Sequence, residues 1–314
     1  MSIYSSSYED PYRSPYQSIT QAGAGGGVGS LTVQVQALFT GGYDGTMLMV
    51  PPVPQVGATS MFREPQAQSS VTAVDQTVGL LLDCKHDFAV GPQLLSDPGF
   101  DSPGVWGGSP QWSVSGGKAT HLGTGAQYLA QSGLQPTRYK WYQMGIDVLR
   151  YDTGQSLAVY CGNSDITLNL TVGSLGTKAC YLPSVSAPTL GFAIRGGASG
   201  GQIAEVDNFL VNELYGRHAY QGTGSLKPKL SSDGKRIQFD GVDDTLSVLF
   251  PALGSNCTIG QVTTGGSPSI LAGQTIAAGA RAITTNFSRY FVINRALTSP
   301  ETAILTAWLA EGAL

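Results

Sequence analysis

Residues 139–149 read YKWYQMGIDVL, and two similar runs follow, SLAVY at 156–160 and IAEVDNFLV at 203–211. Each run is short and rich in aromatic and β-branched residues, and Gly, Pro, Asn and Asp separate one run from the next. Such runs are typical of strands, and several of them at short intervals are typical of a sandwich or jelly roll. The middle of the chain is therefore predicted to be a β-sandwich.

Further strands are predicted within this region and on both sides of it. Their apolar residues alternate with polar ones or form short runs between turn residues. In the middle region they are the segment around Trp112 and Val114, and residues 126–131, 166–172 and 190–194. Outside it they are residues 31–36, 47–50, 236–240, 245–250 and 290–293. Residues 78–82 form a compact apolar run that we expect to be buried.

One helix is predicted, close to the C-terminus. Thr298 and Glu301 have the spacing of a capping box, and Pro300 lies in the first turn, where its missing N–H is harmless. The apolar residues that follow share one helical face: Ile304, Leu305, Trp308 and Leu309. The predicted fold class is mainly β, with jelly-roll or β-sandwich domains, an extended N-terminal arm and one C-terminal amphipathic helix.

Charge and hydropathy exclude two classes of partner. Charged residues make up 12% of the 314 residues, and the net charge is −4 with a pI near 5.3. Nucleic-acid binding needs a basic stripe that neutralises phosphates, and the 17 Lys and Arg residues form no such run. No apolar run has the length needed to span a bilayer, and residues 1–16 lack the features of a signal peptide. We expect synthesis in a cytoplasm followed by assembly.

Residues 1–30 have a biased composition with two alternative interpretations. Tyrosines recur every four residues among Ser and Pro, and a Gly-rich stretch follows at 22–30. The segment is either a disordered tail or an extended arm that docks into a neighbouring subunit. We predict a docking arm with these contact residues: Tyr4, Tyr8, Tyr12 and Tyr16.

Three segments resemble elements of virion proteins of tailed bacteriophages. They are MFREPQAQSSVTAVDQTVGLLLD at 61–83, KPKLSSDGKRIQFDGVDDTLS at 227–247 and FVINRALTSPETAILTAWLA at 291–310. The last two are also similar to laminin-G-like jelly rolls. The resemblance implies a structural protein of the virion that is assembled in the host bacterial cytoplasm. It also implies other virion proteins as partners and a homo-oligomer, for which a trimer is common in fibres and spikes.

A second resemblance concerns the middle of the chain. The strings LLSDPGFD at 94–101, WSVSGG at 112–117 and VDNFLV at 206–211 resemble carbohydrate-binding modules of the jelly-roll type. Asp97-Pro98-Gly99 departs from the Asn-Gly that those modules have at the first turn. In the phage proteins such a module is often inserted between the first two elements. The implied organisation is an arm at 1–30, a β-rich segment at 31–87 that pairs with the C-terminal part, an insert at 88–216 and a laminin-G-like domain at 217–314.

The insert contains aromatic residues that could stack on sugar rings. They are Trp106, Trp112, Tyr128, Tyr139, Trp141, Tyr142, Tyr151 and Tyr160. Any of them could equally belong to the core of a sandwich. Trp106 lies in a Gly/Pro-rich loop at 103–110, so we expect it to be the best exposed. The predicted glycan-binding set is Trp106, Tyr128, Trp141, Tyr142, Glu205 and Asp207.

Glu205 and Asp207 raise the question of catalysis. They stand two positions apart, so they share one face of a strand, as in the E-x-D-x-x-E signature of retaining β-glucanases, which this segment resembles. The third carboxylate of that signature is Leu210 here, so the general acid is missing. No nucleophile elbow, phosphate loop or H-E-x-x-H motif is present in the sequence. We predict that the protein is not an enzyme.

Two further groups leave alternatives open. Asp240, Asp243 and Asp244 either bind calcium, the one cofactor that the sequence allows, or hydrogen-bond the backbone of a turn. The four cysteines, Cys84, Cys161, Cys180 and Cys257, lack zinc-ribbon spacing and are expected to be buried thiols. A bridge between Cys161 and Cys180 is the alternative.

The sequence favours a bacteriophage virion structural protein that displays a glycan-binding module for attachment to the host. The candidates are a tail fibre, a baseplate appendage and a head spike. The alternatives are a virion-associated polysaccharide depolymerase and a purely architectural subunit.

Overall fold

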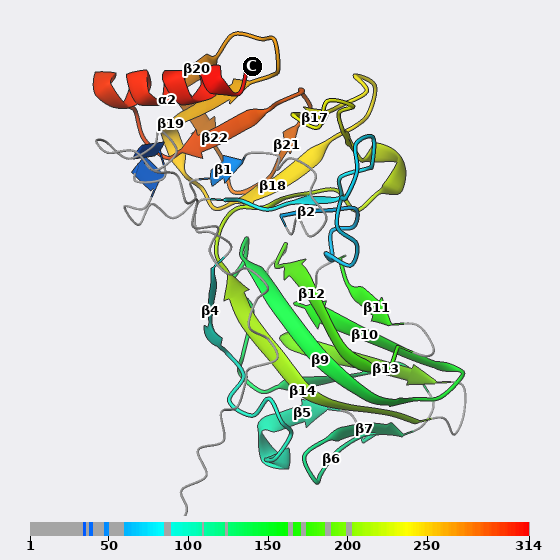
Figure 1. Ribbon diagram of the computed structural model, residues 1–314. Coiled ribbons are helices and arrows are strands. Elements are labelled where there is room, and N and C mark those ends of the chain that lie inside the picture. Colours follow the sequence, from blue (N-terminus) through cyan, green and yellow to red (C-terminus); the bar gives the residue numbers. More distant parts are fainter. Residues whose placement is uncertain are drawn as a thin grey trace, which may run out of the picture.

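Alternation of apolar and polar residues in the middle of the chain produces two sheets whose apolar sides face each other. The computed structural model describes residues 34–35, 38–39, 47–49, 60–84, 89–108, 110–122, 125–162, 166–170, 174–185, 190–198 and 203–313. They form a mainly β protein with two domains that lie one above the other (Figure 1). The predicted fold class is therefore confirmed. The tyrosines of the predicted arm lie outside the described residues.

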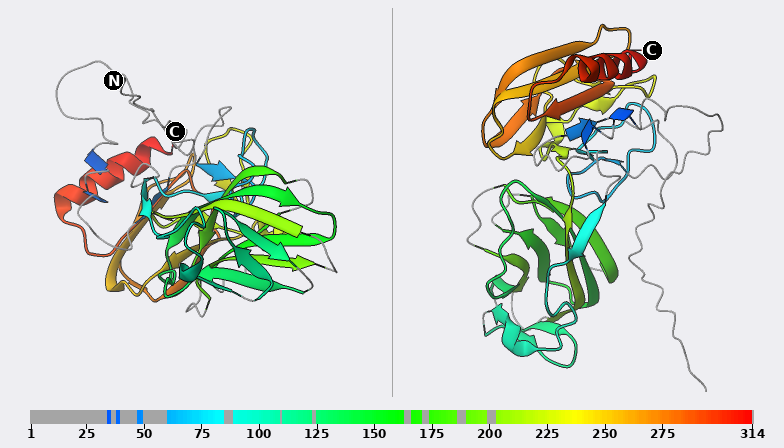
Figure 2. Two further views of the ribbon diagram at one scale, coloured as in Figure 1. Left: turned by 90° about the horizontal axis from the view of Figure 1, so that it is seen from below. Right: turned by 90° about the vertical axis from the view of Figure 1, so that its left-hand side faces the viewer.

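The lower domain in Figure 1 is a sandwich of two antiparallel sheets, seen edge-on in the right-hand view of Figure 2. The first sheet has the order β12-β9-β14-β7-β6, with β4 also paired to β14, and the second has the order β11-β10-β13-β8-β5. The strands are β4 (Val90–Gln93), β5 (Trp106–Gly108), β6 (Trp112–Val114), β7 (Ala119–Leu122), β8 (Gln127–Gln131), β9 (Trp141–Tyr151), β10 (Gln155–Cys161), β11 (Leu168–Leu170), β12 (Gly176–Pro183), β13 (Phe192–Ala198) and β14 (Ile203–Leu214); a 3₁₀ turn, η1 (Pro103–Val105), precedes β5.

Every second residue of these strands enters the core between the sheets. On β9 the inward residues are Tyr142, Met144, Ile146 and Val148, and β10 contributes its own alternate residues from the opposite sheet. Cys161 and Cys180 are buried in this core as free thiols, so the alternative of a bridge between them is not realised. Burial raises the pKa of both thiols.

The upper domain combines strands from both sides of the sandwich in the sequence. One sheet has the order β1-β22-β19-β20 and the other β2-β3-β15-β18-β21. Their bounds are β1 (Met47–Met49), β2 (Met61–Phe62), β3 (Leu80–Leu81), β15 (Ala219–Tyr220), β18 (Leu246–Phe250), β19 (Gly254–Val262), β20 (Ser269–Ile276), β21 (Gly279–Ile283) and β22 (Arg289–Ile293). A 3₁₀ turn, η2 (Gly224–Leu226), and a hairpin of β16 (Lys229–Leu230) and β17 (Ile237–Gln238) complete it.

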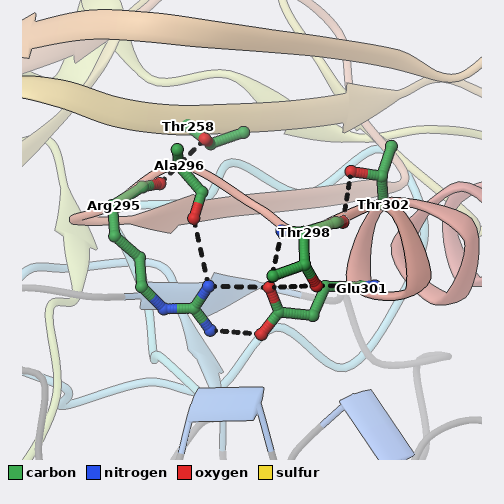
Figure 3. A network of polar contacts seen from close by, with 6 residues as sticks. All are labelled: Thr258, Arg295, Ala296, Thr298, Glu301 and Thr302. Carbon is green, nitrogen blue, oxygen red and sulfur yellow. Dashed lines mark hydrogen bonds and ion pairs between the residues drawn. The ribbon is translucent and has the colours of Figure 1, made fainter.

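The helix α2 (Ser299–Glu311) lies across the outer side of the sheet that contains β19 and β22 (Figure 1). Thr298 and Glu301 form the predicted capping box, and Glu301 also accepts two hydrogen bonds from Arg295, at 2.6 and 2.8 Å (Figure 3). Leu305, Trp308 and Leu309 are buried against the sheet. The helix therefore begins at a charged, fully hydrogen-bonded cap and is fixed by its apolar face.

The strand predicted at 31–36 is wrong at the two residues that the structure describes there. Gln34 and Val35 are helical, as are Leu38 and Phe39. Val35 and Phe39 are four positions apart, so a helix places both on one side, and both are fully buried in the cluster beneath α2. Burial of this pair outweighs the local alternation that favours a strand. No helix in the described part of the chain is long and apolar enough to cross a membrane.

A cluster of aromatic and aliphatic side chains joins the two domains. Trp141, at the start of β9, is fully buried and packs edge-on against His218 and Tyr220, with ring centroids 5.5 Å away in each case. The other members are Phe62, Leu80, Leu82, Tyr181 and Leu214. This set is called the junction cluster below.

Hydrogen bonds surround the junction cluster and also cross between the domains. Arg217 donates to the carbonyl of Tyr139, and the amide of Gln68 donates to the carbonyl of Ala179 at 2.7 Å. His218 Nδ1 accepts from the backbone N–H of Asp83 at 2.8 Å, which requires that nitrogen to be unprotonated. Apolar burial and the hydrogen bonds that cross the junction make the two domains one packed unit.

Replacing Trp141 with alanine is expected to lower the free energy of unfolding by about 3–5 kcal/mol, because it opens a cavity in the junction cluster. Denaturant unfolding of the full chain measures this loss. The control is Leu175→Ala, since Leu175 is 54% exposed and its loss should change stability by about 0.5 kcal/mol or less. Equal effects of the two substitutions would show that the domains do not stabilise each other.

The Arg295–Glu301 pair predicts a pH dependence of stability. The Arg295 guanidinium and the cap hydrogen bonds lower the pKa of Glu301 from 4.5 to about 2. A carboxyl with a depressed folded pKa contributes stability that is complete above its unfolded pKa and is lost as the pH falls through its folded pKa. The loss should therefore occur between pH 4.5 and 2.

Unfolding measured at pH 5 and pH 2.5 should show a smaller loss of stability in Glu301→Gln than in the unchanged chain, since glutamine does not titrate. Thr298→Ala is the control. It removes the cap hydroxyl at a cost of about 1 kcal/mol but leaves the ion pair, so most of the pH dependence should remain. An identical pH dependence in Glu301→Gln would contradict the assignment.

Candidate functional site

The outer face of the sheet β11-β10-β13-β8-β5 carries a group of aromatic and polar side chains that are exposed or half-buried. Inward residues such as Leu157 and Val159 alternate with outward ones, so Ala158 and Tyr160 of β10 face away from the core. In one row across the sheet, Tyr128, Arg195, Ala158 and Asn169 are directly paired from strand to strand. Tyr160 is paired with Ala193 in the next row. We call this set the tyrosine face.

Small residues form the floor of the tyrosine face. Ala158 is 4% exposed and Ala193 is fully covered, although neither belongs to the core between the sheets. At Gly197, also on this face, a Cβ atom would lie 2.6 Å from the hydroxyl of Ser156, so a larger residue does not fit without displacement. Ala158 and Ala193 are thus covered rather than open to solvent, and the exposed residues of the tyrosine face are Tyr128 and Asn169.

The two tyrosines and the arginine contact one another. The rings of Tyr128 and Tyr160 meet edge-to-face with centroids 5.3 Å apart, and the Arg195 guanidinium carbon lies 6.0 Å from the centroid of Tyr128. Burial raises the pKa of Tyr128, and the neighbouring Tyr160 raises it further. The hydroxyl of Tyr128 therefore stays protonated at neutral pH. Tyr128 nevertheless keeps 38% of its surface exposed.

This arrangement suits the recognition of a polyhydroxylated ring. An aromatic face can stack on the C–H groups of a sugar, which gives apolar contact without full desolvation. The phenol hydroxyls both donate and accept hydrogen bonds, the amide of Asn169 does the same, and Arg195 donates several. The tyrosine face therefore combines stacking with hydrogen bonding on an open sheet surface.

Trp106 does not take part in the tyrosine face, because it is buried. The prediction that it is exposed is wrong. It is 7% exposed, and its Nε1 donates to Asp97 Oδ2 at 2.9 Å. Its ring lies 4.5 Å from that of Phe100 inside the sandwich. The loop that carries it becomes strand β5 and pairs with β8, which turns the indole into the core.

Two other aromatic residues of the predicted set are also inside. Trp141 belongs to the junction cluster, and Tyr142 is 2% exposed in the core, where its hydroxyl accepts from the backbone N–H of Thr137 at 2.7 Å. Burial raises the pKa of Tyr142 to about 12. Both faces of β9 are covered at this end, by the opposite sheet and by the upper domain, so neither ring offers a stacking surface.

The tyrosine face includes residues that the predicted set lacked. Of that set only Tyr128 lies there, and the structure adds Tyr160, Arg195 and Asn169. The sequence indicated these outward residues in SLAVYC at 156–161 and FAIRGG at 192–197. Alternate residues of these strands enter the core, so the rest must face outward. What the sequence did not show is which strands are neighbours.

Glu205 and Asp207 lie on the other sheet and do not join the tyrosine face. Glu205 forms an ion pair with Lys118 at 2.8 Å, and Asp207 accepts from the backbone N–H of Asn208 at 2.7 Å. Burial, and then the nearby Asp147 and Asp101 carboxylates, raises the pKa of Asp207. The structure therefore does not bring the six residues of the predicted set together, because β14 and β8 belong to different sheets.

The three aspartates after β17 meet in one turn. Candidate ligand oxygens of Asp240, Asp243 and Asp244 all lie within 4.8 Å of one another. Asp240 Oδ1 also accepts from the backbone N–H groups of Val242, Asp243 and Asp244, at 2.8–3.2 Å, and these hydrogen bonds lower the pKa of Asp240. Burial raises the pKa of Asp244. The turn is thus held by its own backbone, and calcium binding there stays a prediction.

Comparison with known proteins adds little to this picture. No protein-family model and no curated protein matches the chain. Among solved structures, the adhesin domain of Epf from Streptococcus pyogenes aligns with 76% of this chain and 79% of its own, at 8% identity and a TM-score of 0.26. A similarity at that level carries no inference about function.

The burial of Trp106 makes a prediction that separates packing from binding. Trp106→Ala should lower the free energy of unfolding by about 3–5 kcal/mol, since it removes a core ring and the partner of Asp97. Thermal or denaturant unfolding measures the effect. Tyr128→Ala is the matched control on the outer face, with an expected change of about 1 kcal/mol or less. Similar stability of the two variants would place Trp106 outside the core.

Proposed function

We propose that this chain is a structural protein of a bacteriophage virion that binds a host cell-surface glycan through the tyrosine face. The observation that carries the glycan part is the pair Tyr128 and Tyr160 beside Arg195, with Tyr128 38% exposed. A tail fibre, a baseplate appendage and a head spike are the candidate positions in the particle.

The proposal about glycans rests on exposure combined with spacing. Neighbouring strands lie about 4.8 Å apart, so the row from Tyr128 on β8 to Asn169 on β11 extends over roughly 14 Å. That length accommodates more than one sugar ring of an extended chain. A site on the outer face of a sheet also admits the interior of a polysaccharide, whereas a closed pocket would admit only its end.

The proposal about the virion rests on sequence resemblance and is supported by how those segments pack. The segment 61–83 contributes β2 and β3, and the segment 291–310 contributes part of β22 and α2, so both build the upper domain. The glycan-binding sandwich is carried by this domain through the junction cluster. Such an organisation suits a homo-oligomer that other virion proteins hold at its base, with the N-terminal arm as the docking element.

Of the two alternative functions, the structure gives no specific support to a depolymerase, because Glu205 is paired with Lys118. A purely architectural role would leave the tyrosine face without a ligand. A binding experiment separates that role from glycan attachment.

The test is binding of the full chain to an array of bacterial cell-surface polysaccharides. We expect saturable binding that Tyr128→Ala and Tyr160→Ala each weaken about tenfold or more, the equivalent of ~1.4 kcal/mol of lost stacking. Leu149→Ala is the matched control, because Leu149 is a 50% exposed residue of the other sheet. Absence of binding to every polysaccharide, or equal loss in the control, would favour the architectural role.

A further inference from the structure

The tyrosine face contains an isolated positive charge. The five strands of this sheet read WGG, QYLAQ, QSLAVYC, LNL and FAIRGGA, and Arg195 is the one charged residue among them. Arg195 is paired with Tyr128 on the neighbouring strand β8 and with Ala158 on the neighbouring strand β10. No carboxylate of these strands is therefore available to neutralise the guanidinium.

The surroundings of Arg195 differ from those of the arginines that form ion pairs. Arg150 is paired with Asp152, Arg289 with Glu311 and Arg295 with Glu301, at 2.6–3.0 Å. Across the described residues, the contact of Arg195 is instead the ring of Tyr128, and it forms no ion pair. In a chain of net charge −4, Arg195 is thus a half-buried guanidinium beside an exposed tyrosine, with no carboxylate paired to it among the described residues.

We propose that the ligand of the tyrosine face is an acidic polysaccharide, and that Arg195 binds the carboxylate of a uronic acid residue in it. This inference rests on the proposed glycan binding and specifies its substrate class. A guanidinium presents two parallel N–H groups that match the two oxygens of a carboxylate. Stacking on Tyr128 or Tyr160 holds the sugar ring while Arg195 holds its acid group.

The charge pattern also argues against denser polyanions. Nucleic acids and anionic membrane surfaces need several basic residues along one surface, and this sheet supplies one. The net charge of −4 adds a repulsion that grows with the charge of the ligand. A uronic acid residue is a sugar ring with one carboxylate, and it fits a site that has two aromatic rings and one cation.

The experiment compares each acidic polysaccharide with its neutral counterpart. The full chain is titrated with alginate, polygalacturonate and hyaluronan, and with the same polymers after their carboxyl groups are reduced to alcohols. We expect binding to at least one acidic polymer and about tenfold or more weaker binding to its reduced form, since a charge-assisted hydrogen bond is lost. Raising the salt concentration to 0.5 M should also weaken the binding.

Three arginine variants locate the effect. Arg195→Gln should weaken binding to the acidic polymer about tenfold or more and leave the residual affinity for the reduced polymer unchanged. Arg195→Lys should weaken binding to the acidic polymer less than Arg195→Gln does, because lysine keeps the charge. Lysine still lacks the two parallel N–H groups of the guanidinium. Arg150→Gln, on the other sheet, is the control and should bind as the unchanged chain does. Melting temperatures should remain close to that of the unchanged chain for both Arg195 variants.

The outcomes distinguish the two proposals. Binding that depends on Tyr128 but is equal for acidic and reduced polymers, or unchanged in Arg195→Gln, overturns the acidic substrate class and leaves glycan binding in place. Failure to bind both these polymers and every polysaccharide of the array overturns the glycan proposal together with this one. Selective, salt-sensitive binding that needs Arg195 supports both.

Discussion

The antiparallel pairing of β3 with β15 is the constraint on which the rest of the structure depends. Leu81 lies opposite Ala219 and Leu80 opposite Tyr220, so the chain leaves the upper domain and returns to it at the same place. The whole sandwich is inserted between these two strands. Because β3 and β15 are paired, the two ends of the insert are held side by side, and the junction cluster forms where the two domains meet.

The junction cluster in turn determines which faces of the sandwich are free. Trp141 and Tyr181, from the outer side of the sheet with β9 and β12, are covered by the upper domain. The other sheet meets the upper domain beside β11, where Gln66 Nε2 donates to the carbonyl of Thr167 at 3.0 Å, and Tyr128 remains exposed on its outer side. The division of labour between two similar sheets thus follows from which one packs against the neighbouring domain. The sheet with β9 and β12 supplies the side chains of the junction cluster, and the other sheet carries the tyrosine face.

Much of the fold could be predicted from local patterns. The runs that became β9, β10, β14 and β18 alternate clearly, and the capping box marks the start of α2. Strands such as β12 and β20 were not predicted, because GTKAC and SILAGQTI lack a regular alternation and are strands only through their neighbours. Val35 was predicted as part of a strand at 31–36 for the opposite reason. Its burial with Phe39 under α2 overrode a local alternation of apolar and polar residues.

The sequence by itself determined the fold class, the helix at the C-terminus and the presence of many aromatic residues in the insert. It did so because strand alternation and helix caps are local and need only a few neighbouring residues. Only the tertiary structure decided which aromatic residues are exposed: Trp106, Trp141 and Tyr142 are buried and Tyr128 is not. It also brought Tyr160 and Arg195 to Tyr128, since strand order depends on pairings between segments that are distant in the chain.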